Sequence, residues 1–113
     1  EAPMTPRVAM PAAQRRLYSR LRQLLDAPGA LRGTLVQSRQ RCGKPTCRCA
    51  SDPEARHPAL LLCFSTNGKR TSVYVPREWE QRVREWVARY GEIREVLEQL
   101  SQQYLARLKA RQE

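Results

Sequence analysis

The chain has 113 residues, a formal net charge of +10 and an isoelectric point near 10.3. With two Trp, four Tyr and one Phe, a chain of this length predicts one small domain with a thin apolar core. No apolar run is long enough to span a bilayer, and the N-terminus has no signal-peptide apolar region. We therefore expect a soluble protein rather than a membrane protein. Four cysteines could form two disulfides in a secreted chain, but their clustering suits metal binding in a reducing cytoplasm better.

The basic charge is distributed unevenly along the chain. Residues 1–58 carry eleven Lys and Arg against four acids, residues 59–76 two against none, and residues 77–113 eight against seven. A basic head followed by a nearly neutral C-terminal third is typical of proteins that bind a polyanion, most often nucleic acid. The alternative is that the charge only maintains solubility.

The N-terminal part predicts an arm and one helix. Residues 1–11 contain three prolines and little to bury, so we expect a mobile arm. From Ala12 to Ala27 leucines recur at helical spacing, with Pro11 expected as the first helical position and Pro28-Gly29 as the end. Arginines lie largely outside the leucine stripe, and whether they face only water or also phosphate is left open.

A short strand, predicted over residues 33–39, leads into a turn that holds three of the four cysteines. With the single histidine downstream, the pattern is C-x4-C-x-C-x7-H, formed by Cys42, Cys47, Cys49 and His57. Three thiolates and one imidazole are the ligands of a closed tetrahedral zinc site. Cys63, in an apolar run, is the alternative fourth ligand. Two other interpretations are possible. The cysteines could be ordinary buried or free thiols, or they could form a redox switch, because the neighbouring Arg and Lys would lower the thiol pKa values and favour the thiolate.

A hairpin follows the cysteine turn, after a loop expected over residues 51–58. Asn67-Gly68 between the apolar runs 60–65 and 70–75 is the pattern of a type I′ turn, which needs positive φ at both residues. This turn sets Phe64 opposite Thr71, Leu62 opposite Val73 and Leu60 opposite Val75 on the predicted core face.

Residues 77–111 predict one long helix, because they contain no proline and repeat apolar residues every 3.5 positions on average. We expect the aromatic half of this stripe, from Trp79 to Tyr90, to pack on the hairpin and the first helix. The remaining apolar positions would then be free to pack against a second copy of the chain in a homodimer. A parallel pairing is disfavoured, because it would place Arg89 of one copy next to Arg94 of the other and their like charges would repel. These dimer positions are Ile93, Leu97, Leu100, Tyr104 and Leu108. The alternative is that the stripe folds back on its own domain.

Together these elements predict an α+β fold: an N-terminal helix, a small three-stranded antiparallel sheet with a zinc knuckle, and a long C-terminal helix with coiled-coil character. The expected division is an arm at 1–11, a basic head at 12–76 and the long helix at 77–113.

The chain resembles a family of small uncharacterised bacterial proteins. The motifs that carry the resemblance are C-G-K-P-T-C-R-C at 42–49, His57-Pro58, T-S-V-Y-V-P at 71–76 and the long charged helix. The glycine that follows the histidine in the family is missing here, and the family's aromatic run is replaced by Ala59-Leu60-Leu61-Leu62. The resemblance implies Cys42, Cys47, Cys49 and His57 as zinc ligands, no established activity, and an association with mobile-element genes.

These patterns predict a zinc-stabilised accessory protein that binds nucleic acid, with DNA favoured, as a dimer associated with the nucleoid and with transposition or recombination. The expected phosphate contacts are Arg15, Arg16, Arg22, Arg39, Arg41, Lys44, Arg48, Lys69 and Arg70. A protein-interaction adaptor for a recombinase or transposase and a thiol redox sensor are the alternatives. We do not expect an enzyme, because four protein ligands leave a metal ion no open position for a reacting water.

Overall fold

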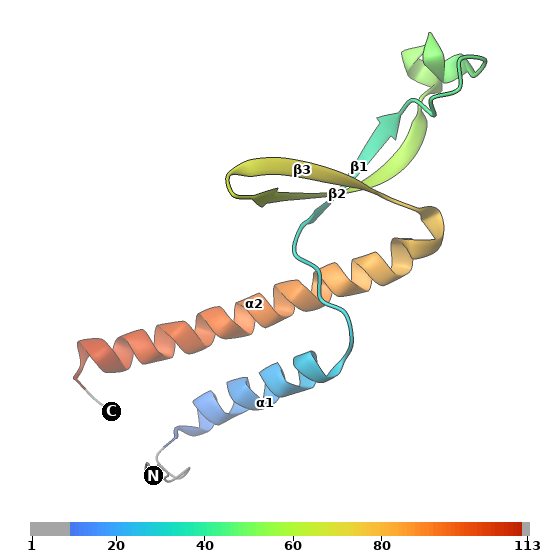
Figure 1. Cartoon of the computed structure of the whole chain (residues 1–113). Coiled ribbons are helices and arrows are strands. Elements are labelled where there is room, and N and C mark those ends of the chain that lie inside the picture. Colours follow the sequence, from blue (N-terminus) through green and yellow to red (C-terminus); the bar gives the residue numbers. More distant parts are fainter. Residues whose placement is uncertain (1–9, 112–113) are drawn as a thin grey trace. The chain divides into compact units, whose positions relative to one another are not determined.

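The computed structural model describes residues 10–111, so most of the predicted N-terminal arm lies outside the described residues (Figure 1). The two helices are α1, Ala12–Asp26, and α2, Glu80–Lys109, and the three strands are β1, Thr34–Gln40, β2, His57–Thr66, and β3, Lys69–Val75. Short 3₁₀ turns are η2, Arg48–Ala50, η3, Pro53–Ala55, and η4, Arg77–Trp79. The predicted α+β class is confirmed, with the first helix starting after Pro11 rather than at it.

The chain forms two compact units. The sheet unit comprises residues 30–88, and the helical unit comprises residues 10–29 and 89–111 of the described chain. This grouping differs from the expected head and long helix, because α2 contributes its first turns to the sheet unit and the rest to the helical unit.

The three strands form an antiparallel sheet in the order β1-β2-β3. In the hairpin, Asn67 has φ of 52° and Gly68 has φ of 77°, as a type I′ turn requires. The turn fixes the register that the sequence predicts, with Phe64 opposite Thr71, Leu62 opposite Val73 and Leu60 opposite Val75.

The core of the sheet unit lies between one face of the sheet and the first turns of α2. Its buried residues are Leu60, Leu62, Val75 and Val83, with Leu31, Leu35, Phe64, Trp86 and Val87 packed around them. Val73 was expected on the core face but is about half exposed and lies outside this cluster, whereas Val75 on the same strand is buried in it. The predicted packing of Val83 and Trp86 on the hairpin is confirmed.

The helical unit has its own core, in which α1 packs on the C-terminal part of α2. Leu24, Val96 and Leu100 are buried, and Leu17, Tyr18, Leu21 and Ile93 pack against them. From the sequence, α1 was expected to join the head, which left Ile93 and Leu100 for a partner chain. Both residues instead pack within the chain, because the leucine stripe of α1 needs an apolar surface and finds it on this part of α2.

One buried polar side chain lies between the two helices of this unit. Gln14 is only 1% exposed, and its amide donates to the Tyr104 hydroxyl and accepts from Arg107 at 3.4 Å. The Tyr18 and Tyr104 hydroxyls lie 2.9 Å apart, and this hydrogen bond is the main reason why the pKa of Tyr18 is raised. These contacts fix the position of α1 along the axis of α2, because sliding one helix past the other would leave the buried Gln14 amide without hydrogen-bond partners.

We predict opposite effects from alanine at two glycines. At Gly33, φ is +156° and an added Cβ would lie 2.6 Å from Leu62 Cδ1, so Gly33→Ala should lower the free energy of unfolding by about 1–3 kcal/mol. At Gly91, inside α2, an added Cβ meets nothing within 4 Å, so Gly91→Ala should raise it by up to about 1 kcal/mol. Urea unfolding measures both changes, and equal effects of the two variants would contradict the described backbone at Gly33.

Candidate metal centre

The pairing of β1 with β2 determines where the cysteine turn closes. Gln40, the last residue of β1, pairs with His57, the first residue of β2. The loop over residues 41–56 therefore leaves and re-enters the sheet at neighbouring positions. Cys42 lies just after β1 and His57 begins β2, so strand pairing brings the first and last members of the predicted ligand set together.

Tight turns bring the two middle cysteines to the same point. Gly43 has φ of +86°, a conformation that side chains with a Cβ rarely adopt. The Cys47 amide then donates to the Lys44 carbonyl at 3.1 Å, and the Ala50 amide donates to the Cys47 carbonyl at 3.0 Å, where η2 begins. These turns reverse the chain within a few residues and direct Cys47 and Cys49 back toward Cys42.

The four predicted ligands form one cluster. Their ligand atoms all lie within 4.8 Å of one another, with Cys47 Sγ 3.3 Å from His57 Nε2 and Cys49 Sγ 3.5 Å from Cys42 Sγ. Around a tetrahedral zinc ion, bond lengths of about 2.3 Å to sulfur and 2.0–2.1 Å to nitrogen place ligand atoms about 3.5–3.8 Å apart. The cluster therefore fits a single metal ion after small side-chain adjustments.

Hydrogen bonds and burial act differently on two of the thiols. Hydrogen bonds from the Cys49 backbone and then from His57 lower the pKa of Cys47 to about 6. At Cys49 the Cys42 backbone amide lowers the pKa, but burial and the neighbouring thiols outweigh it, so the pKa of Cys49 is raised. Crowded thiolates repel one another, and a cation at their centre removes that repulsion. The cluster is thus suited to holding a positive ion.

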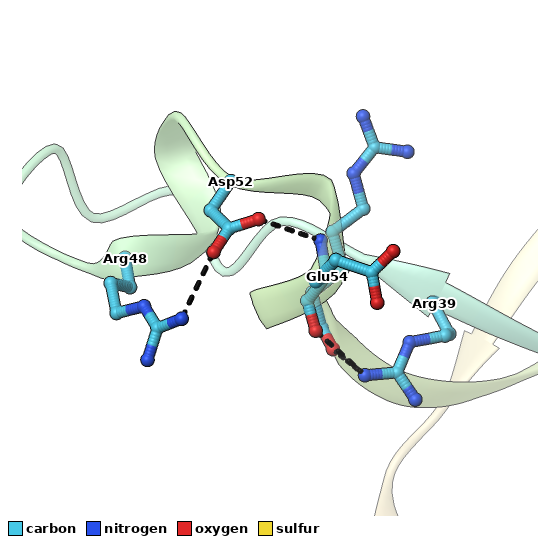
Figure 2. Close-up of polar contacts among 5 residues, drawn as sticks. Arg39, Arg48, Asp52 and Glu54 are labelled. Carbon is cyan, nitrogen blue, oxygen red and sulfur yellow. Dashed lines mark hydrogen bonds and ion pairs between the residues drawn. The ribbon is translucent and has the colours of Figure 1, made fainter.

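A second set of contacts holds the remainder of the loop in place (Figure 2). Asp52 caps η3 by accepting from the Glu54 amide at 3.0 Å, and its other oxygen accepts from Arg48 at 3.0 Å. Arg39 of β1 donates to the Arg56 carbonyl at 2.7 Å. From the sequence, this segment was expected to be a plain loop and Asp52 was missed, although Asp followed by Pro and Glu is the pattern of a helix N-terminus.

Cys63, the alternative fourth ligand, is not part of the cluster. It pairs with Thr34 and Ser72 within the sheet, and its Sγ lies 3.3 Å from the Ser72 hydroxyl. Cys63 lies six positions beyond His57 along the extended strand, a distance of about 20 Å at roughly 3.3 Å per residue. The group that lies together therefore contains the histidine as its fourth member.

The predicted phosphate-contacting residues fall into three groups. Arg39 and Arg48 make the loop contacts just described, and Arg15, Arg16 and Arg22 lie on α1 in the helical unit. The third group is Arg41, Lys44, Lys69 and Arg70, which are exposed in the sheet unit. Within residues 10–111 these four make no side-chain hydrogen bond or ion pair, and Arg41 and Lys44 line one shallow hollow beside Cys49.

In the described part of the chain, neither helix is long and apolar enough to cross a membrane. No curated protein and no solved structure gives a significant match to the chain. A family model does match, over residues 14–85, and this range includes all four members of the cluster and the whole sheet. Since this range covers more than half of the chain, the protein belongs to the family described as a domain of unknown function (DUF6788).

Proposed function

We propose that this protein is a zinc-stabilised, nucleic-acid-binding accessory protein, with DNA as the favoured target. The observation that carries the proposal is the Cys42, Cys47, Cys49 and His57 cluster, which lies in a loop that also presents free basic side chains. The metal would hold the loop in one conformation, and the loop would present positive charge to phosphates. The link to transposition or recombination is part of the proposal and rests on the family resemblance.

Zinc is favoured because of the chemistry of the donors and the composition of the loop. Thiolate and imidazole ligands together suit Zn²⁺, and four protein ligands make a structural site. Of residues 41–56 only Cys49 is buried, so apolar packing gives this loop little stability. A metal ion bound by residues at both ends and in the middle of the loop would replace the missing core.

We expect the purified protein to contain one zinc ion per chain by elemental analysis. Cys49→Ser should lose most of the metal, because it removes the buried ligand, and should raise amide hydrogen exchange over residues 41–56. Cys63→Ser is the matched control and should keep the metal, since Cys63 lies outside the cluster. Metal-free wild-type protein with a fully protected loop would contradict the zinc site.

Nucleic acid is favoured as the partner because of the charge of the sheet unit. The three strands contain no Asp or Glu, and they carry Arg39, Lys69 and Arg70. Arg41 and Lys44 add positive charge in the loop at one end of the sheet, and Lys69 and Arg70 lie at the hairpin end. Free Lys and Arg side chains bind phosphates and release their counterions.

We predict that binding to a DNA duplex weakens steeply as salt increases. Lys69→Ala with Arg70→Ala should lower affinity and reduce the slope of log K against log salt by about 0.9 for each phosphate that the variant no longer binds. Arg84→Ala is the control for the removal of positive charge, because Arg84 already pairs with Glu80 at 3.1 Å. Binding that does not depend on salt, or an equal effect of Arg84→Ala, would contradict the proposed phosphate contacts.

Self-association through α2 remains part of the proposal, with a corrected set of residues. Leu97 and Leu108 are 49% and 60% exposed, and Tyr104 and Leu105 are exposed between them. These side chains form an apolar stripe beside the face that packs on α1. A second copy of the chain would cover the stripe. The adaptor function would use the same stripe to bind a different protein.

We expect sedimentation velocity to show a concentration-dependent dimer. Leu97→Ser with Leu108→Ser should shift the protein to monomer with little change in unfolding, because both leucines lie outside the packed core. Leu25→Ser, which removes an exposed leucine from α1, should leave the dimer intact. A wild-type chain that is monomeric at all concentrations would exclude self-association and favour the adaptor.

A further inference from the structure

The second face of the sheet lacks the apolar cover that the first face receives from α2. Side chains alternate along a strand, so the residues neighbouring Leu60 and Leu62 point to the face opposite the core. There Val36, Leu61 and Tyr74 form one row across the three strands, because Val36 pairs with Leu61 and Leu61 pairs with Tyr74. Val36 is 38% exposed and Tyr74 is 60% exposed. A large aromatic ring therefore lies open to solvent on this face.

The neighbours of Tyr74 differ toward the two ends of its strand. Away from the hairpin, Tyr74 lines a small hollow with Arg77 and Glu80, and the Glu80 carboxylate is paired with Arg84. The next row toward the hairpin consists of Thr34, Cys63 and Ser72, which do not cover the ring. Arg70 lies four residues before Tyr74 on the same strand, and therefore on the same face, near the hairpin turn. In the part of the chain that the structure describes, the Tyr74 hydroxyl makes no hydrogen bond. The ring has no role in the core and no polar partner to hold it.

Basic groups lie at both ends of the sheet, and Tyr74 lies between these ends. Its partner Leu61 is halfway between His57, where the metal-binding loop ends, and Ser65, which pairs with Arg70. The strand from His57 to Ser65 is about 26 Å long at roughly 3.3 Å per residue. Arg41 and Lys44 belong to the loop at the first end. At the second end Arg70 lies on the face of Tyr74, and Lys69, one residue earlier, lies beside the hairpin turn on the opposite face. This order suits a single strand of nucleic acid whose phosphates contact the two ends of the sheet while one of its bases contacts Tyr74 in the middle.

We infer that this face binds single-stranded nucleic acid, with a base stacked on Tyr74 and the backbone held by the basic ends. The inference deepens the proposed function, on which it rests, by naming the form of the nucleic acid. A duplex keeps its bases stacked inside and offers a flat face only phosphates, whereas a single strand can place a base on an exposed ring. The absence of Asp and Glu from all three strands favours a polyanion over a protein at this face.

The test compares three variants of the full chain on two probes. The probes are a fluorescent oligothymidine of about twelve nucleotides, within the usual site size of about 4–16 nucleotides, and a duplex of the same length. Tyr74→Leu keeps an apolar side chain but removes the aromatic ring, and should weaken single-strand binding about 5-fold to 150-fold, the range for one stacked base. Tyr74→Phe should bind like wild type, because it retains the ring.

The control is Val73→Ala, which lies on the same strand but on the opposite face and is also about half exposed. It should not change single-strand binding, and Tyr74→Leu should not change duplex binding. Zinc content and urea unfolding, measured on each variant, confirm that the variants are folded. If Tyr74→Leu binds the single strand as wild type does, while duplex binding stays salt-dependent, the inference is overturned and the proposed function stands. If neither probe binds the wild-type protein in a salt-dependent way, both the inference and the proposed function are overturned.

Discussion

The pairing of Gln40 with His57 is the contact on which the candidate metal centre depends. The hairpin turn fixes the register of β2 with β3, and β1 pairs with the other edge of β2 with no residue skipped. That register places the histidine at the end of the strand, beside the point where the cysteine loop leaves β1. A slip by one residue would move every side chain of β1 to the other face and displace the first cysteine from the histidine. The apolar core under the sheet therefore also positions the metal ligands.

One apolar stripe along α2 contributes to two separate cores. The first turns of α2 cover Leu60, Leu62 and Val75 of the sheet, and its later turns cover Leu24 of the first helix. Neither core is large, and each depends on a different half of the same α-helix. This arrangement explains why the apolar repeat continues without a break along α2 although the residues that it meets change completely.

The elements that the sequence predicts well are those determined by local chemistry. Asn67-Gly68 fixes the hairpin because few other dipeptides accept positive φ at both positions, and the register of three residue pairs follows from it. The spacing of the cysteines and the histidine identifies the cluster for a similar reason, since these residue types seldom gather for packing alone. Four of the candidate ligands lie together as predicted, and Cys63 lies apart.

The errors concern contacts between segments that are distant in the sequence. The leucine stripe of α1 shows which side of the helix is buried, but it carries no information on which surface covers it. The expected partner of α1 was the aromatic first half of the long helix, and the actual one is the C-terminal part of α2. The same limitation explains the assignment of Ile93 and Leu100 to a dimer. The loop contacts of Arg39 and Arg48 were likewise not predicted, because their partners become apparent only when the loop is folded.

Gln14 and Tyr104, which meet in the helical unit, are 90 positions apart in the sequence. Contacts of this separation form slowly, because the intervening chain loses much conformational freedom when its ends meet. During synthesis on the ribosome, α1 emerges long before the part of α2 that covers it. Its leucines therefore remain uncovered until nearly the whole of this chain has been translated, and in that interval they are a natural point of contact for chaperones.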